Sequence, residues 1–185
     1  MTKSILILKS SPRPQGNSSL LADSAAQSAS LAGAQVEMVS LHGMDIRPCD
    51  GCDSCLDTGA CVIGDDMQSL YPKLLSADAL LLASPIYWFT YSAQLKVCID
   101  RWYSIFNYNK DFLKGKPVGI ILSYGDDDLY SSGAINAIHS FESMLRYLQA
   151  DLAGIVHGSL NDEGEALQHP GLLEKARALG KMLAS

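Results

Sequence analysis

Five short apolar runs, rich in Leu, Ile and Val, recur along this chain, and longer helical stretches separate them. The runs cover residues 4–8, 36–41, 79–84, 117–122 and 152–156. The run at 79–84 is almost entirely apolar, as a strand buried on both faces should be. Helices are expected at 18–31, from 65–66 onward, and at 92–103, 135–148 and 170–182. Strands that alternate with helices predict a parallel sheet with helices on both faces.

Five such units favour an α/β fold with a doubly wound, flavodoxin-like sheet in the order 2-1-3-4-5. The third strand is then expected near the centre of the sheet. We predict one domain over residues 1–185, because a chain of this length can bury a sufficient hydrophobic core without disulfides or structural metals. The one long stretch without a pattern, residues 42–64, exceeds the usual loop length and is therefore expected to be functional or disordered.

The charge balance excludes some classes of partner. The formal net charge is −6, and the 14 lysines and arginines form no cluster, so neither nucleic acid nor an anionic membrane surface is an expected partner. The first apolar run breaks at Lys9, too early for a signal peptide, and no run approaches the roughly 20 residues of a membrane span. We therefore expect a cytoplasmic protein, in which thiols stay reduced.

The turn between the first strand and the first helix has the composition of an anion site. In a doubly wound sheet, ligands bind beyond the carboxyl ends of the strands at the switch point. Residues 10–19 read SSPRPQGNSS, which combines hydroxyls, an amide and a cation with the N–H groups of a helix start. The patterns of triphosphate and dinucleotide sites are absent, so a terminal monophosphate fits best. A plain capped turn is the alternative.

The loop after the third strand is aromatic. Residues 84–91 read SPIYWFTY and place four aromatic side chains within five positions. Such side chains could cover a flat heterocycle while backbone amides meet its polar edge. The alternative is that they only plug the end of the sheet.

Together these loops carry a family resemblance. The segments are Ser11-Pro12-Arg13, Gly16-Asn17-Ser18, residues 84–88, and Leu95-Lys96 through Asp100-Arg101-Trp102. In this order, and with the strand rhythm of the whole chain, the sequence resembles the flavodoxin-like NAD(P)H-dependent FMN reductase and quinone reductase family.

The resemblance implies bound FMN, with NAD(P)H as electron donor and a quinone, flavin or other small molecule as acceptor. It places the FMN phosphate near Ser10, Arg13, Asn17, Ser18 and Ser19, although Arg13 could serve NADPH instead. It places the flavin ring on Pro85, Ile86, Tyr87, Trp88, Ser123, Tyr124 and Gly125. No side chain is assigned a catalytic role, because the flavin carries the redox chemistry.

Four of the five cysteines crowd the patternless stretch, as Cys49-x2-Cys52-x2-Cys55-x5-Cys61. Thiols at this spacing can hold a cubane cluster, whereas structural zinc sites favour two separated pairs. The iron–sulfur flavoproteins of the same family carry a compact motif of this kind. Interleaved aspartates, however, raise the cost of gathering thiolate charge. We expect bare thiols in the isolated protein, with [4Fe–4S] as the alternative, and we expect the cysteines near the flavin side of the sheet.

Two functions therefore stay open. The first is an NAD(P)H-dependent FMN oxidoreductase, and the second is an iron–sulfur flavoprotein that carries electrons without direct nicotinamide turnover. The aromatic side chains between Trp102 and Phe112 suggest a subunit contact or cleft wall, with local packing as the alternative. A homodimer or homotetramer is expected.

Overall fold

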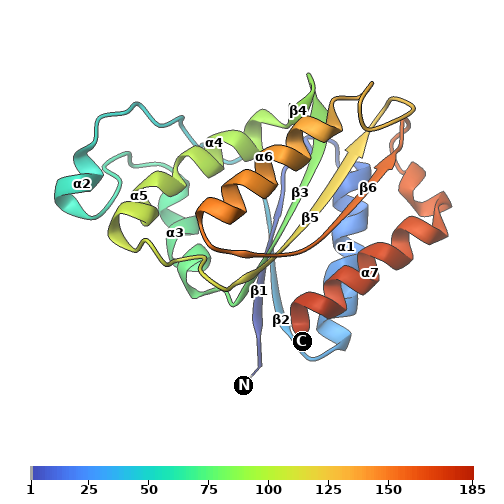
Figure 1. The fold of residues 1–185 in the computed structure, drawn as a ribbon, viewed down its shortest axis with the longest axis horizontal. Coiled ribbons are helices and arrows are strands. Elements are labelled where there is room, and N and C mark those ends of the chain that lie inside the picture. The colour runs from blue at the N-terminus through green and yellow to red at the C-terminus, as the bar shows by residue number, and fades with distance from the viewer. Residues whose placement is uncertain (1) are drawn as a thin grey trace.

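The computed structural model describes residues 2–185 and has a parallel sheet in the order β2-β1-β3-β5-β6 (Figure 1). These five strands are β1 (Ser4–Lys9), β2 (Gln35–Ser40), β3 (Ala79–Tyr87), β5 (Pro117–Tyr124) and β6 (Asp151–Ser159). A two-residue strand, β4 (Thr90–Tyr91), pairs antiparallel with the end of β3. Counted along the parallel strands, this is the predicted order 2-1-3-4-5, so the flavodoxin-like fold is confirmed.

Helices cover both faces of the sheet, as predicted. One face carries α1 (Asn17–Leu31) and α7 (Pro170–Ala184), which pack side by side (Figure 1). The other face carries α3 (Met67–Ser76), α4 (Ala93–Asp100), α5 (Trp102–Tyr108) and α6 (Ala134–Tyr147). A short 3-10 helix, η1 (Glu165–Gln168), precedes α7.

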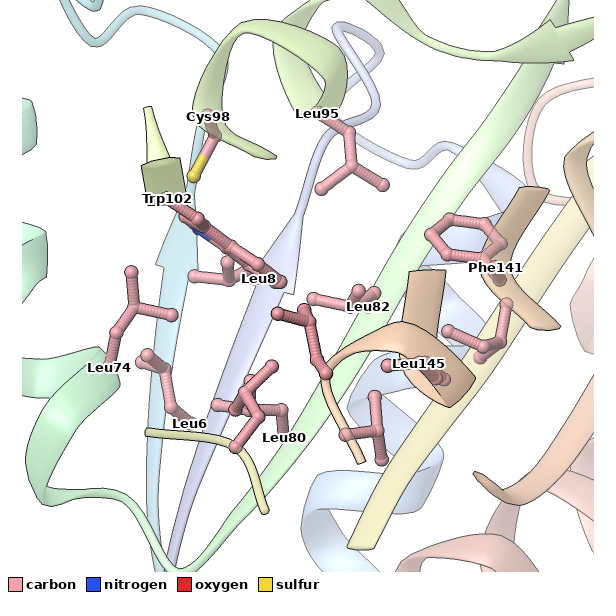
Figure 2. Packing of buried hydrophobic residues seen from close by; sticks show 14 of the residues in the cluster. Leu6, Leu8, Leu74, Leu80, Leu82, Leu95, Cys98, Trp102, Phe141 and Leu145 are labelled. Carbon is pink, nitrogen blue, oxygen red and sulfur yellow. The ribbon is translucent and has the colours of Figure 1, made fainter. Parts of the chain in front are cut away.

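Alternating strand residues supply the two hydrophobic clusters that hold these layers together. Leu6, Leu8, Leu80 and Leu82 face the α3–α6 side, where Figure 2 shows them against Leu95, Trp102 and Phe141. Ile5, Ile7, Leu81 and Ala83 face the α1 and α7 side. The central strand β3 has residues 79–85 all buried, because it contributes to both clusters.

Several elements differ from the sequence-based expectation, and β5 and β6 both extend beyond the predicted 117–122 and 152–156. The helix predicted at 92–103 is divided into α4 and α5 at Arg101. β3 runs to Tyr87, beyond the predicted end at residue 84, because Ile86 and Tyr87 pair with β4 in a hairpin. The patternless stretch 42–64 contains a short helix, α2 (Ser54–Thr58). Across residues 2–185, no helix is both long and apolar enough to cross a membrane.

Candidate functional site

The carboxyl ends of β1, β3, β5 and β6 meet at one edge of the sheet, and the loops that follow them surround a cavity of about 220 Å³. Its walls come from four separate segments at the ends of these strands and the start of α1: Ser11, Arg13, Gly16, Asn17, Pro85, Ile86, Tyr87, Ser123, Tyr124, Gly125, Leu160 and Asn161. The structure thus brings together eight of the twelve residues predicted to bind the cofactor, and Trp88 lines the adjoining cavity.

The N-terminus of α1 forms one wall of this cavity. The first hydrogen bond of the helix runs from the Leu20 N–H to the Gly16 carbonyl, so the earlier N–H groups stay outside the helical ladder. The Ser18 hydroxyl is buried and has no hydrogen-bond partner among the described residues. Free amides and an unsatisfied hydroxyl at a helix start fit a phosphate group.

The turn before α1 is tight. A Cβ atom on Gly16 would lie 2.0 Å from the Ser11 hydroxyl oxygen, which is far inside contact distance. The Ser11 hydroxyl in turn accepts a hydrogen bond from the Arg13 N–H at 3.2 Å. Glycine at position 16 therefore permits the close fold of this loop around the space where a phosphate would bind.

Two predicted phosphate ligands have their side chains committed to the protein itself. The Ser10 hydroxyl is buried, donates to the Ala83 carbonyl at 3.1 Å and accepts from the Ser92 hydroxyl at 2.8 Å. The Asn17 amide donates to the Asp162 carbonyl at 2.8 Å and accepts from the Ala166 N–H at 3.0 Å. Ser10 thus joins the end of β1 to β3 and to Ser92 at the start of α4. Asn17 holds the segment after β6 against α1.

The other predicted ligands of the phosphate loop have different surroundings. Arg13 is exposed at the rim of the cavity, where a cation can approach an anionic group from solvent. Ser19 is buried in the first turn of α1. Ser11, Gly16, Leu160 and Asn161 line the cavity without having been predicted. The motifs that contain Ser11 and Gly16 could have indicated that these two residues line the site. No motif in the sequence indicated the loop after β6.

A second, open cavity of about 580 Å³ adjoins the first. The two share Ile86, Tyr87, Tyr124 and Gly125 as lining residues. Trp88, Phe89, Asp126, Ser131 and Ser132 complete the wall of the second cavity. Its size falls in the range of small-molecule sites, about 300–1,000 Å³. A planar group at the shared wall would therefore have room for a second molecule beside it.

The tip of the β3–β4 hairpin projects at this cavity in an unusual conformation. Trp88 and Phe89 have φ angles of 46° and 66°, the left-handed region that bulky residues rarely occupy. Trp88 is 92% exposed, so packing does not explain its presence. The Asn136 side-chain amide donates to the Phe89 carbonyl at 3.3 Å and anchors the hairpin to α6.

A tyrosine of the shared wall pairs with a histidine behind it. The Tyr124 hydroxyl lies 3.1 Å from Nδ1 of His157 on the neighbouring strand, and the two rings stack. Burial raises the pKa of Tyr124 and lowers the pKa of His157, so burial favours the neutral form of both rings. No role for His157 was predicted from the sequence, because its contact with Tyr124 depends on strand pairing.

The four cysteines of the patternless stretch line one separate pocket. Cys49, Cys52, Cys55 and Cys61 all border it, and each is a free thiol. Burial raises the pKa of the Cys55 thiol. Within residues 2–185, no three Cys, His, Asp or Glu side chains are already gathered as metal ligands. The donor set fits a thiolate-bound metal in kind, but the side chains would have to draw closer together to hold one.

This cysteine pocket lies away from the cavity at the strand ends. The two share no lining residue, and the loop carries α2 beyond α4 and α5 to one end of the molecule, whereas β4 lies nearer its middle (Figure 1). The expected position near the flavin side of the sheet was based on where the loop leaves β2. The four cysteines do gather around one pocket, as predicted, but that pocket is separate from the cavity at the strand ends.

The family follows from the sequence as a whole. Residues 4–161 match the family model described as NADPH-dependent FMN reductase, which covers every loop of the cavity. The chain belongs to this family. This is the family that the resemblance of its motifs implied.

The relatives divide between two kinds of flavoprotein. An iron–sulfur flavoprotein of Archaeoglobus fulgidus is 33% identical over 94% of this chain and 76% of its own length. YwqN of Bacillus subtilis, whose name describes an NAD(P)H-dependent FMN-containing oxidoreductase, is 28% identical over 95% of this chain and 96% of its own. An iron–sulfur flavoprotein of Methanocaldococcus jannaschii is 38% identical, but over only 52% of this chain and 50% of that protein. This chain therefore spans about half of that last relative.

A solved structure shows the same fold. The NAD(P)H:quinone oxidoreductase of Methanothermobacter marburgensis superposes with a TM-score of 0.77 over 100% of this chain and 98% of its own, at 19% identity. At that identity the likeness supports the fold alone.

Proposed function

We propose that this protein is an FMN-dependent oxidoreductase that takes reducing equivalents from NAD(P)H and passes them to a quinone, a flavin or another small acceptor. The observation that carries the proposal is the pair of adjoining cavities at the strand ends, one with a phosphate-type helix start and one open to a second molecule. FMN, when bound, supplies hydride and single-electron chemistry.

In this proposal the first cavity holds the cofactor. The free N–H groups of α1, the unsatisfied Ser18 hydroxyl and the exposed Arg13 would bind its phosphate. Asn17 and Ser10 would support cofactor binding indirectly, because their side chains hold the surrounding segments in place. Residues 85–88 and 123–125 would hold the ring.

The second cavity would receive donor and acceptor in turn. A flavin ring held at the shared wall would keep one face open to this cavity. Trp88 and Phe89 offer exposed aromatic surface at the mouth of the cavity. Because this cavity is open to solvent, it suits small molecules that bind and leave during turnover rather than a permanently bound group. The Tyr124–His157 pair, favoured as neutral by burial, adds no fixed charge behind this wall.

Rapid anaerobic mixing of the FMN-loaded protein with NADPH, and separately with NADH, tests this function. We expect at least one donor to bleach the oxidised flavin band in a single turnover, and an added quinone to restore it. Failure with both donors, together with ready reduction by ferredoxin, would contradict direct nicotinamide turnover.

The second candidate function is that of an iron–sulfur flavoprotein acting as an electron carrier. One observation favours it: four free cysteines line a single pocket. The Archaeoglobus fulgidus relative, which matches most of this chain, has that name. The visible spectrum of protein purified without oxygen tests this candidate, since flavin and iron–sulfur absorption appear in one measurement.

Other expectations from the sequence stay predictions. These are a single domain, a cytoplasmic location and a homodimer or homotetramer. A partly apolar groove formed by Trp102, Tyr103 and Phe106 against Tyr147 is consistent with a subunit contact. Sedimentation of the purified protein would determine the oligomeric state.

A further inference from the structure

The cysteine pocket contains a buried arginine whose contacts converge on it. Arg101 stands at the C-terminal end of α4, and only 1% of its surface is exposed. Its Nη1 donates to the Arg47 carbonyl at 2.8 Å, and its Nη2 lies 3.3 Å from the sulfur of Cys61. One guanidinium therefore contacts both limbs of the loop and one of its thiols.

Asp65 holds this guanidinium in place. Its two carboxylate oxygens accept from Arg101 at 2.5 and 3.2 Å, and both side chains are fully buried. The same carboxylate accepts the Arg47 N–H at 2.9 Å and the Met67 N–H at 3.1 Å. A bidentate pair of this kind fixes direction as well as distance. The Arg101 guanidinium is consequently aimed at Cys61 before any ligand is present.

A second N–H donor approaches another sulfur of the pocket. The Asn107 side-chain amide, from α5, lies 3.9 Å from the sulfur of Cys55. It is held there by a bond to the Tyr103 carbonyl at 2.9 Å. Two of the four thiols thus have N–H donors from the α4–α5 segment, which forms one wall of the pocket.

The charges around the pocket give Arg101 a further role. Asp50, Asp53 and Asp100 also line it, and Arg101 is the one cation among the described lining residues. Four cysteines that bind a metal do so as thiolates, which would add negative charge to an already acidic pocket. The Arg101–Asp65 pair is neutral as a whole, but its guanidinium presents an N–H donor to the Cys61 sulfur, where that charge would gather.

We propose that Arg101 is a positioning residue of the four-cysteine pocket, which orients Cys61 and donates a hydrogen bond to its sulfur so that the pocket can assemble and hold an iron–sulfur cluster. This inference rests on the second proposed function. Groups that orient metal ligands commonly change metal affinity about 10- to 100-fold when they are removed. Hydrogen bonds to cluster sulfurs also influence the reduction potential.

The test compares wild-type protein with Arg101→Lys after anaerobic reconstitution with iron and sulfide. Lysine keeps the charge but lacks the planar fork that reaches Asp65 and Cys61 together. The matched control is Arg177→Lys, an exposed arginine paired with Glu174 on α7. Circular dichroism and FMN binding establish that each variant folds. The readouts are bound iron and sulfide, the rate of iron loss to a chelator, and the reduction potential of the cluster.

We expect the wild type and Arg177→Lys to hold about four iron atoms per chain, as a [4Fe–4S] cluster requires. Arg101→Lys should lose iron at least about tenfold faster and have a lower reduction potential. Equal retention and equal potential in the folded variant would overturn the role of Arg101 while the cluster function stands. If the wild type itself takes up no iron, the cluster function and this role both fail, and the FMN oxidoreductase is untouched.

If Arg101→Lys does not fold, the wild-type protein can answer the question. The protein is grown with ¹⁵N-labelled arginine, reconstituted and reduced, and pulsed electron paramagnetic resonance is recorded. A guanidinium nitrogen in contact with a cluster sulfur should give a ¹⁵N coupling to the cluster spin. The absence of that coupling would overturn the proposal.

Discussion

At the scale of single residues, Gly16 and Ser18 determine what the helix start can bind. Gly16 keeps the loop closed against Ser11, and Ser18 leaves a buried hydroxyl without a partner. An unsatisfied buried hydroxyl costs about 1–3 kcal/mol in folded-state stability. A bound phosphate oxygen would remove that cost.

Gly16→Ala should weaken FMN binding and destabilise the fold by about 1–3 kcal/mol, because the added methyl overlaps the Ser11 side chain. Flavin titration and urea denaturation measure the two effects. The control is Gly64→Ala, where a Cβ atom meets nothing within 4 Å. Equal FMN affinity in wild type and Gly16→Ala would show that the turn does not shape the site.

The sequence suggested a chemistry for these loops, but it did not indicate the contacts of each residue. The composition of residues 10–19 indicated a phosphate site, and the aromatic loop indicated a flat ligand. The partners of Asn17 and Ser10 could not be predicted, because they are distant in sequence. Asn17 contacts the loop after β6, and Ser10 contacts β3 and the start of α4. The Arg101–Asp65 pair was equally hidden, since 36 residues separate its two members.

At the scale of elements, the β3–β4 hairpin is the least relaxed part of the site. Two-residue hairpin loops with positive φ at both positions favour Asn and Gly, yet here they are Trp88 and Phe89. Residues in sparsely populated backbone regions cost about 1–3 kcal/mol each and tend to occur at functional sites. The exposed indole of Trp88 is therefore a candidate contact for the donor or acceptor.

Trp88→Asn should raise the stability of the folded protein by up to about 1 kcal/mol, because Asn tolerates the left-handed conformation. The same change should slow flavin reduction by NAD(P)H, since it removes aromatic surface from the open cavity. Trp88→Phe, which keeps the ring and the strain, serves as the control. Wild-type rates in Trp88→Asn would contradict a role for this side chain in turnover.

The α1–α7 contact offers a test of packing within one helix. A Cβ atom on Gly180 would lie 2.1 Å from the Ala25 carbonyl oxygen, whereas Gly171 in the same helix has open space. Gly180→Ala should therefore destabilise the protein by about 1–3 kcal/mol or more. Gly171→Ala should be neutral or slightly stabilising. Thermal denaturation of both variants decides the matter, and equal stabilities would contradict this packing.

The strand and helix rhythm predicted the elements well, and its errors have physical causes. Strand period and apolar runs located five strands, but the hairpin pairing that extends β3 to Tyr87 depends on a partner strand. The break between α4 and α5 occurs at Arg101, whose burial against the cysteine loop is a tertiary effect. Local pattern does not contain that information.

At the scale of the whole molecule, the buried Arg101–Asp65 pair joins the cysteine loop to the helical layer. Burial alone would raise the pKa of Asp65, but hydrogen bonds from Arg101 and from the Arg47 N–H outweigh it, so the net pKa lies below the ordinary value. The pair therefore contributes stability that is present above the unfolded-state pKa of about 3.9 and is lost as pH falls through the folded value.

Asp65→Asn should lower the stability at neutral pH and flatten its decline in acid, because the titrating group is gone. Denaturant unfolding at a series of pH values measures both effects. Asp111→Asn, which alters an exposed contact with Lys114 at 3.6 Å, is the control and should change little. If the stability of Asp65→Asn fell in acid as steeply as that of the wild type, the Arg101–Asp65 pair would not be the source of this pH dependence.

The central claim is that the cavity at the strand ends binds FMN through its phosphate. The most direct measurement is titration of flavin-free protein with FMN and with riboflavin, which has the same ring but no phosphate, followed by flavin fluorescence. Several charge-assisted hydrogen bonds, each worth about 1.5–3 kcal/mol, should make FMN the much tighter ligand. Equal binding of the two flavins, or binding of neither, would contradict the account.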